Sequence, residues 1–214
     1  MATPFASTIT TDAELRALYR EPSPRVQAKK VNRIDATTRA FIEGSPFCLV
    51  ATAGADGHCD VSPRGGPPGF VKVLDEGRLA IPDLSGNNLL DSLSNIVANP
   101  QAGLLLVIPG RDETLRVEGE AHLTTDPAVL ELWDDELRRP KVAIGLAVRT
   151  VYIHCAKSFR RGRVWDPASW TELTAPDTCE VFVDQLGLDL DPAQVRSSLE
   201  QSYERDLAAE RPGR

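Results

Sequence analysis

The spacing of apolar positions divides the chain into three parts. In residues 1–44 apolar side chains recur at helical intervals, and two helices are predicted there. The first, TDAELRALY, is capped by Thr11 or Asp12 and runs to Tyr19. The second ends at Gly44 and carries one stripe, made of Val31, Ile34, Thr38, Phe41 and Ile42. We expect this N-terminal helical segment to pack on the domain that follows.

Residues 45–167 show a different pattern, which predicts about six antiparallel strands. FCLVATA at 47–53 is a continuous apolar run, as in a strand buried on both faces, whereas 115–123 alternates strictly between apolar and polar residues. Tight turns such as GADG and DEG join neighbouring strands, and a GxGxxG motif is absent after the first strand. The pattern therefore favours a small antiparallel barrel over a doubly wound sheet. The other predicted strands cover 58–61, 70–74, 78–81, 102–108 and 147–155.

Helical spacing returns in three places after the fourth predicted strand. The helix that ends before Pro100 carries the stripe Leu89, Leu90, Leu93, Ile96 and Val97. The next opens at Asp126 and carries Leu130 and Trp133, and we interpret the charges after it, Asp134, Asp135 and Glu136, as solvated. The C-terminal extension, residues 168–214, is helical from Asp191, with a narrow stripe of Val195, Leu199, Tyr203 and Leu207. Such a stripe suits packing on the body of the protein or on a partner subunit.

One segment between two predicted strands has an unusual composition. Residues 62–69 read SPRGGPPG, which predicts a loop. Its prolines stiffen the backbone, and its glycines let the backbone approach a ligand without a Cβ in the way. Arg64 adds a permanent cation whose fork of donors suits a phosphate, and Lys72 on the following strand adds a second cation from the same side. Taken alone, the segment is also compatible with a purely structural corner.

A second segment, SGNN at 85–88, directly precedes the predicted 89–97 helix. Free backbone N–H groups and the positive end of the helix dipole favour an anion there, and Ser85, Asn87 and Asn88 add neutral donors. Capping of the helix by Ser85 or Asn87 is the alternative. Because only one hairpin separates SGNN from SPRGGPPG, the two segments together predict a phosphate-binding site.

The composition is that of an ordinary soluble protein with an acidic balance. Of the 214 residues 42% are hydrophobic and 26% charged, and the formal net charge is −7. An excess of negative charge argues against nucleic-acid or anionic-membrane partners. We find no apolar run of about 18 residues and no export-type start in MATPFASTITTD, so we expect a soluble cytoplasmic protein.

The cysteines and histidines do not form a recognisable metal or redox motif. Cys48, Cys59, Cys155 and Cys179 are widely spaced, without a CxxC, and are expected to be buried free thiols. The pairs His58–Cys59 and His154–Cys155 lie on predicted strands. Neighbouring strand residues point to opposite faces, so each pair offers at most one ligand to either face, and no metal site is predicted.

The order of these motifs resembles a known family. The segment DVSPRGGPPGFVKVLDEGRLAIPDLSGNNLLDSLSNIVANPQAGLLLVIPGRDETLRVEGEAHL and the later CAKSFRRGRVWDP are similar to the pyridoxamine 5′-phosphate oxidase-related, FMN-binding split-barrel proteins. The resemblance is strong over residues 45–125 and extends through 155–167. It implies a mainly β (β + α) fold, a six-stranded antiparallel split β-barrel with peripheral helices. It also implies a homodimer that binds FMN in two grooves at the subunit interface.

Site residues follow from the same resemblance. It places the phosphate of FMN on Lys72, Asn87 and Asn88, and the flavin along Arg64 and the backbone of 62–65. This chain has Asn87-Asn88 where the oxidase has an Arg-Lys pair, and Thr114 where the oxidase has a Gln. The full set of implied cofactor-binding residues is Ser62, Pro63, Arg64, Gly65, Val71, Lys72, Pro82, Asn87, Asn88, Thr114, Arg116, Arg160 and Trp165.

Two of these positions have a second interpretation. Arg116 either faces the flavin or is a solvated partner of Glu118 or Glu120. Residues 157–163 contain four cations, Lys157, Arg160, Arg161 and Arg163. They either form a solvated basic patch, with Trp165 filling a gap in the core, or reach the flavin groove, with Trp165 over the edge of the ring. The Arg-x-His substrate motif of the oxidase has no counterpart in RRGRVW, so pyridoxamine phosphate is not the expected substrate.

Three functions remain after this comparison. The first is an FMN-dependent oxidoreductase acting on a small molecule; it requires no obligatory acid–base residue, and none is predicted. The second is a flavin-binding or flavin-sensing module without turnover. The third is a split barrel that uses deazaflavin or haem. For haem the available axial ligands are His58, His122 and His154, and none of them lies in a characteristic motif.

Overall fold

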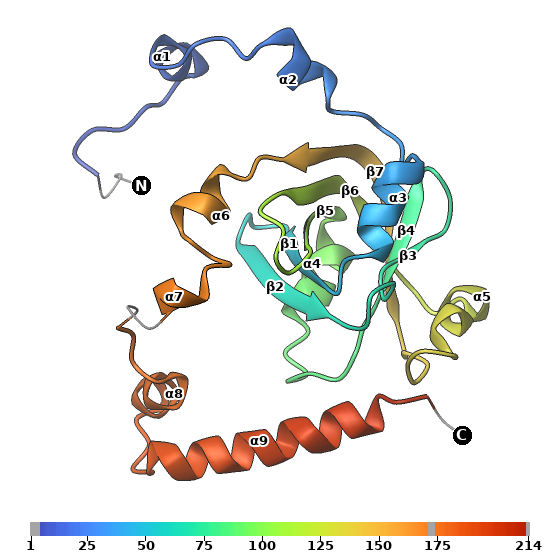
Figure 1. Cartoon of the computed structure of the whole chain (residues 1–214), viewed down its shortest axis with the longest axis vertical. Coiled ribbons are helices and arrows are strands. Elements are labelled where there is room, and N and C mark those ends of the chain that lie inside the picture. Colours follow the sequence, from blue (N-terminus) through green and yellow to red (C-terminus); the bar gives the residue numbers. More distant parts are fainter. Residues whose placement is uncertain (1–4, 171–173, 213–214) are drawn as a thin grey trace.

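An antiparallel sheet of seven strands forms the centre of the part of the chain that the computed structural model describes, residues 5–170 and 174–212 (Figure 1). The spatial order is β2-β1-β5-β6-β7-β4-β3, and every neighbouring pair is antiparallel. The strands are β1 Phe47–Ala53, β2 Cys59–Gly65, β3 Lys72–Val73, β4 Arg78–Pro82, β5 Gln101–Val107, β6 Thr114–Thr124 and β7 Ala143–His154. The sheet curls strongly without closing, because β2 and β3 at its two ends do not pair with each other. The predicted fold class is confirmed.

Helices lie around the sheet. They are α1 Asp12–Ala17, α2 Pro24–Ala28, α3 Ala36–Glu43, α4 Asp91–Ala98, α5 Pro127–Leu130, α6 Lys157–Arg161, α7 Pro167–Trp170, α8 Thr178–Leu186 and α9 Pro192–Ala209, with a short 3₁₀ helix Glu131–Trp133 after α5. α3 and α4 contribute Ile42, Leu93 and Ile96 to the core inside the curled sheet. In the described part of the chain, every helix is too short or too polar to cross a lipid bilayer.

The core follows the alternation seen in the sequence. Along β6, Leu115, Val117 and Ala121 are buried, while Arg116 and His122 are exposed. Each of the seven strands lies on a predicted range, but the predicted 70–74 strand is reduced to two residues in β3, and β7 begins earlier than expected, at Ala143. Apolar side chains from opposite parts of the curled sheet meet in the interior, which holds the barrel together.

The second predicted helix is wrong in its first half. α3 begins only at Ala36, because Asp35 is its N-cap and accepts a hydrogen bond from the Thr38 N–H at 2.8 Å. Before this cap the chain is extended, and Val31 pairs with Val151 at the edge of the sheet. The apolar residues of this stretch therefore contact the barrel in two ways: Val31 through an isolated β-bridge, and the later residues from the helix α3. The first helix ends two residues before the predicted Tyr19.

The predicted SPRGGPPG loop is also partly wrong. Residues 62–65 belong to β2, and the loop begins only at Gly66. Pro63 is tolerated because β2 is an edge strand, with β1 on one side and no sheet partner on the other. A Cβ at Gly66 would lie 2.7 Å from the Cβ of Phe70, so only glycine fits this turn. The stiff part of the segment is the short connection from Gly66 to Phe70.

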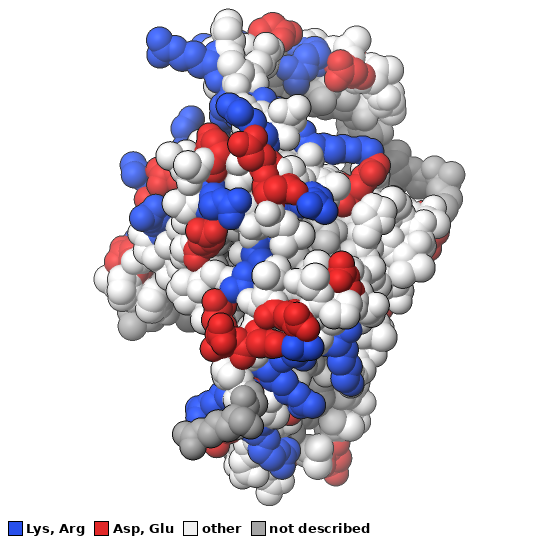
Figure 2. Space-filling view, turned by 90° about the vertical axis from the view of Figure 1, so that its right-hand side faces the viewer, with Lys and Arg blue, Asp and Glu red and all other residues white. Residues whose placement is uncertain are grey.

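Charges on the outside are arranged in short-range pairs. The face formed by α3, β3, β4 and α5 carries Lys and Arg side chains interspersed with Asp and Glu (Figure 2). Examples are Arg78 with Asp75 at 2.7 Å and Arg39 with Glu43 at 3.4 Å. Exposed pairs of this kind contribute about 0–1 kcal/mol to stability. This face therefore presents no broad surface of one charge sign, and the absence of nucleic-acid partners stays a prediction.

The cysteines do not all lie where the sequence placed them. Cys48 and Cys179 are buried, but Cys59 and Cys155 are exposed, so the expectation of four buried thiols is wrong for two of them. Burial raises the pKa of the Cys48 thiol to about 12. Cys59 is exposed because it lies at the start of an edge strand, next to a turn, and Cys155 because it directly follows the end of β7.

The first prediction concerns the bulge between Glu118 and Gly119, where the β6–β7 register shifts. A Cβ at Gly119 would overlap the carbonyl oxygen of Ala147, whereas one at Gly103 meets no atom within 4 Å. Gly119→Ala should lower the free energy of unfolding by about 2–3 kcal/mol, and the matched control Gly103→Ala should change it by less than about 0.5 kcal/mol. Urea unfolding measures both; equal stability of the two variants would contradict the packing described.

The second prediction concerns thiol reactivity, because only the thiolate is nucleophilic. At pH 8 the two exposed thiols, Cys59 and Cys155, should react rapidly with an aromatic disulfide reagent, and all four should react after denaturation. Because the pKa of the Cys48 thiol is higher in the folded protein than in the unfolded chain, the folded protein keeps this thiol protonated up to a higher pH. The free energy of unfolding should therefore fall as the pH rises above about 9. Rapid reaction of three or more thiols in the native protein would argue against this burial.

Candidate functional site

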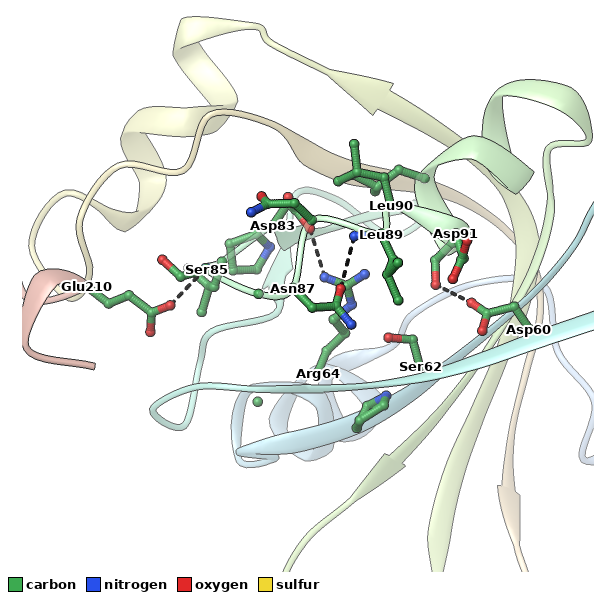
Figure 3. Close-up of a pocket in the computed structure, with 18 of the residues that line it drawn as sticks. Asp60, Ser62, Arg64, Asp83, Ser85, Asn87, Leu89, Leu90, Asp91 and Glu210 are labelled. Carbon is green, nitrogen blue, oxygen red and sulfur yellow. Dashed lines mark hydrogen bonds and ion pairs between the residues drawn. The ribbon is translucent and has the colours of Figure 1, made fainter. Parts of the chain in front are cut away.

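A pocket of about 530 Å³ lies between β2 and the connection from β4 to α4 (Figure 3). Residues 60–65 form one wall and residues 82–93 another. The remaining lining residues are Phe70 from the loop after β2 and Leu207 and Glu210 from the end of the chain. The two segments that the sequence singled out, SPRGGPPG and SGNN, therefore meet across one cavity.

The alternation of β2 decides which of its side chains face the pocket. Asp60, Ser62 and Arg64 are half-buried, whereas Val61 and Pro63 between them are exposed. Side chains two residues apart share one face of a strand, so these three polar groups point the same way. Figure 3 shows Asp60, Ser62 and Arg64 extending from the strand toward the 82–93 segment. An edge strand thus presents a row of polar side chains to the cavity.

Arg64 is the central side chain of this row. Its Nη1 lies 2.8 Å from Oδ1 of Asp83, and both side chains are mostly buried, at 19% and 22% exposed. The Nε of Arg64 is buried and has no hydrogen-bond partner among the described residues. A buried donor without an acceptor is unfavourable by about 1–3 kcal/mol, so such groups are rare in folded proteins. The guanidinium therefore has an unused N–H, itself buried, in a side chain that lines the pocket.

The SGNN segment forms a tight loop ahead of α4 rather than the first turn of the helix. The side chain of Asn87 accepts a hydrogen bond from the Leu89 N–H at 3.0 Å, and Asn88 and Leu90 adopt left-handed backbone conformations with φ of 57° and 61°. Leu90 is the N-cap of α4, without a side-chain capping bond. Capping by Ser85 or Asn87, the alternative considered from the sequence, is wrong. A left-handed Leu is strained, which is common where a loop is shaped around a ligand.

Acidic groups dominate the charge around the pocket. Among the described lining residues, Arg64 is the one cation, and it faces four carboxylates, those of Asp60, Asp83, Asp91 and Glu210. Two of these accept hydrogen bonds from the opposite wall: Asp60 accepts from the Ser92 hydroxyl of α4, and Glu210 Oε1 accepts from the Ser85 N–H of the preceding loop at 2.9 Å. The donors that could bind an anion are thus partly engaged by the protein's own carboxylates.

Lys72, the second predicted cation, lies elsewhere. Its Nζ contacts both carboxylate oxygens of Glu136, at 2.8 and 2.7 Å, and it does not line the pocket. Glu136 and Asp134 are exposed, as expected of solvated charges, and each also pairs with a cation, Glu136 with Lys72 and Asp134 with Arg139. Val71, next to Lys72, is fully buried in the core. A phosphate role for Lys72 stays a prediction.

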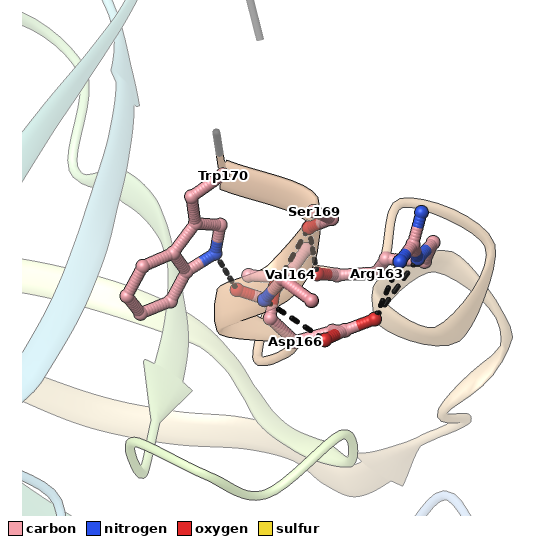
Figure 4. A network of polar contacts seen from close by, with 6 residues as sticks. Arg163, Val164, Asp166, Ser169 and Trp170 are labelled. Atoms are coloured by element: carbon pink, nitrogen blue, oxygen red, sulfur yellow. Dashed lines mark hydrogen bonds and ion pairs between the residues drawn. The ribbon is translucent and has the colours of Figure 1, made fainter. Parts of the chain in front are cut away.

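The basic segment after β7 lies away from this chain's own pocket. Arg160 Nε bonds to Asp112 at 2.9 Å, and the Trp165 ring N–H donates to the carbonyl oxygen of Arg111 at 2.8 Å. Further along, Arg163 pairs with Asp166, and the Trp170 ring N–H donates to the carbonyl of Val164 (Figure 4). These contacts fix the turn that connects α6 to α7. Arg160 and Trp165 are not among the residues that line the pocket.

The remaining predicted residues, Thr114 and Arg116, belong to β6. Thr114 is 2% exposed, and Arg116 Nε pairs with Glu118 at 2.8 Å, as in the solvated alternative. Neither lines the pocket. The pocket does contain Ser62, Pro63, Arg64, Gly65, Pro82, Asn87 and Asn88, and it does not contain Val71, Lys72, Thr114, Arg116, Arg160 or Trp165.

Sequence reasoning missed the four carboxylates of the site, those of Asp60, Asp83, Asp91 and Glu210. Asp83 lies in the quoted PDLSGNN stretch, and its position directly after a strand was an available signal. Asp60 lies two residues before Ser62 on the same strand face, which is also readable from alternation. Glu210 gave no signal, because it is 125 residues away from its partner Ser85. Within residues 5–170 and 174–212, no group of three or more His, Cys, Asp or Glu side chains is arranged to hold a metal ion.

Comparisons with known proteins place the fold in context. A search of curated proteins gave no match. Among solved structures, HupZ from Group A Streptococcus is 18% identical, with a TM-score of 0.47 over 56% of this chain and 93% of that one. A pyridoxamine 5′-phosphate oxidase-like protein from Lactobacillus delbrueckii is 20% identical, with a TM-score of 0.45 over 58% and 98%. The FAD binding protein from Mycobacterium smegmatis is 14% identical, with a TM-score of 0.40 over 58% and 97%.

The family is shown by a sequence model rather than by these structures. The model for pyridoxamine 5′-phosphate oxidase matches residues 34–155, more than half of the 214 residues. The matched range includes α3, all seven strands of the sheet and both main walls of the pocket. This chain belongs to the pyridoxamine 5′-phosphate oxidase family.

Proposed function

We propose that the protein binds FMN in the pocket beside β2 and is an FMN-dependent oxidoreductase acting on a small molecule. The observation that carries the proposal is Arg64, a mostly buried cation that lines a cavity of about 530 Å³ and whose buried Nε has no partner among the described residues. Cofactor pockets commonly have volumes of about 300–1,000 Å³. Membership of a family whose namesake is an oxidase supports the same assignment.

The residues present fit an anionic cofactor. Arg64 lines the pocket, and a phosphate or another anionic oxygen there would accept hydrogen bonds from its guanidinium. Asn88, whose backbone is left-handed, and Asn87 bring polar groups to the same cavity. Phe70 and Leu93, from the loop after β2 and from α4, supply an apolar surface beside them. A cation, neutral donors and an apolar wall together match a phosphorylated ligand with a flat aromatic part.

Each side chain has a separate task in this proposal. Arg64 binds the anionic group, and Asp83 orients the guanidinium by holding Nη1 at 2.8 Å. The apolar wall excludes water from the ring, which strengthens every polar contact inside the pocket. FMN, when bound, would supply the hydride chemistry itself. The protein's contribution is to bind and position the cofactor.

A second copy of the chain is part of the proposal. Arg160 and Trp165 lie outside the pocket of their own chain, and the family resemblance places their flavin contacts at a subunit interface. Apolar side chains exposed near the pocket support such an interface: Val61 is 59% exposed on β2, Leu89 67% before α4, and Val97 76% on α4. Association of two chains would cover these residues and bring a second set of side chains toward each pocket.

The alternatives differ in what they require of the pocket. Haem needs an axial ligand, and the described lining of the pocket includes no histidine. The side chain of His58 is 92% exposed and lies in a turn where its Nδ1 is 2.8 Å from Asp56. A deazaflavin or a flavin that is bound without turnover would use the same polar and apolar walls. These two alternatives are separated from the proposal by experiment.

The third prediction tests the anion contact. Arg64→Ala should weaken FMN binding roughly ten- to a hundredfold, because a charge-assisted hydrogen bond contributes about 1.5–3 kcal/mol. Arg78→Ala is the matched control, since Arg78 is exposed on β4 and pairs with Asp75 outside the pocket. Titration of FMN followed by fluorescence quenching measures both. Unchanged affinity in Arg64→Ala would overturn the assignment of Arg64 to the cofactor.

The fourth prediction separates an enzyme from a passive binder. Added to the FMN-loaded protein without oxygen, NADH or NADPH should bleach the visible absorption of the oxidised flavin, and oxygen should restore it. A protein that binds FMN but is reduced by neither nucleotide supports the flavin-sensing alternative. A preparation that carries haem or deazaflavin instead is recognised by its own absorption spectrum.

A further inference from the structure

The end of α9 reaches the pocket from the far end of the sequence. The helix spans 18 residues, from Pro192 to Ala209, and runs along one side of the molecule from α8 toward the region of α5 (Figure 1). None of its residues is buried, and Tyr203 and Leu207 of its apolar stripe are 53% and 65% exposed. The stripe expected from the sequence to pack on the body of the protein is therefore largely open over its second half.

Glu210, the residue directly after α9, makes the contacts that attach this end. Its backbone carbonyl oxygen accepts a hydrogen bond from the Arg138 N–H at 2.7 Å. Its side-chain Oε1 accepts a hydrogen bond from the Ser85 N–H at 2.9 Å, inside the candidate site (Figure 3). A helix with no buried residue is thus held at the pocket through two hydrogen bonds to one glutamate.

The Ser85 N–H is a donor that a phosphate at this wall would use. It belongs to the loop between β4 and α4, and both Ser85 and Glu210 line the cavity. A carboxylate and a phosphate are both anions that accept hydrogen bonds from backbone N–H groups, and one N–H cannot serve both at full strength. Two anions at this position would also repel each other. One donor of Arg64 is also occupied by a carboxylate of the protein, because its Nη1 already pairs with Asp83.

We infer that Glu210 competes with the phosphate of the cofactor for the Ser85 N–H, so that the end of α9 is displaced when a phosphorylated ligand binds. This inference rests on the proposed function and names a specificity-determining residue of the same site. Displacement exposes little new apolar surface, because the helix buries no side chain. Glu210 therefore lowers the affinity for FMN more than the affinity for riboflavin, which lacks the phosphate.

The experiment compares FMN with riboflavin on the full chain. Glu210→Ala removes the carboxylate, and Glu210→Gln keeps an acceptor oxygen for Ser85 but removes the charge. Glu204→Gln is the matched control, an exposed residue of the same helix that does not line the pocket. We expect Glu210→Ala to bind FMN about tenfold more tightly than the unchanged protein, with riboflavin changed less than about twofold. Glu210→Gln should lie between, and Glu204→Gln should match the unchanged protein.

Equal gains for both flavins would overturn the inference, because they would indicate a general opening of the pocket rather than competition with a phosphate. No gain for FMN in Glu210→Ala, with FMN bound by the unchanged protein, would overturn it too and leave the proposed function intact. If no variant binds either flavin, the proposed function fails, and a second measurement decides the inference. Inorganic phosphate is then titrated while the amide NMR signal of Ser85 is observed.

In that measurement, the signal of Ser85 should shift at about tenfold lower phosphate concentration in Glu210→Ala than in Glu204→Gln. Equal phosphate dependence in the two variants would overturn the inference without reference to any flavin. The amide signals of α9 provide an internal check. In the unchanged protein they should shift together with that of Ser85, because the helix end and the anion exclude each other.

Discussion

Among the described residues that line the pocket, Arg64 alone carries positive charge, and its ion pair with Asp83 fixes where that charge lies. In a chain of net charge −7, an anionic ligand approaches an unfavourable field. One guanidinium with a free donor, held in a half-buried pocket, offsets that field locally, because a charge-assisted bond is stronger where water is excluded. The remainder of the site depends on this arrangement, since the other lining charges are all carboxylates.

The sheet supplies the geometry for that charge. β2 is an edge strand, so it accepts Pro63 and leaves one side open to the 82–93 segment. Its alternation places Asp60, Ser62 and Arg64 on one face, and the tight turn at Gly66 returns the chain to the core at Phe70. Core packing and site construction are therefore coupled: the same turn that buries Phe70 ends the strand that presents Arg64.

Some of the donors in the candidate site are already paired with carboxylates of the protein. Two of the donors that suit a phosphate are already met by carboxylates of the protein, the Arg64 Nη1 by Asp83 and the Ser85 N–H by Glu210. These two acids differ in how they are held. Asp83 directly follows β4, whose residues are mostly buried, whereas Glu210 ends a helix without buried residues. Local structure fixes the first contact, and only weak packing supports the second.

Periodicity and turn residues in the sequence predicted the antiparallel barrel, most of its strands and the two segments that form the pocket, because these signals act over a few neighbouring positions. Alternation at 115–123 and the glycines after Arg64 are examples. The boundaries of α3 and β2 depended on a cap at Asp35 and on an edge position, which local patterns do not reveal. The folded structure was needed to show that Lys72 pairs with Glu136 and that Glu210 reaches Ser85. Such contacts join residues far apart in the chain, and their partners are chosen by how the folded elements are placed, not by spacing along the sequence.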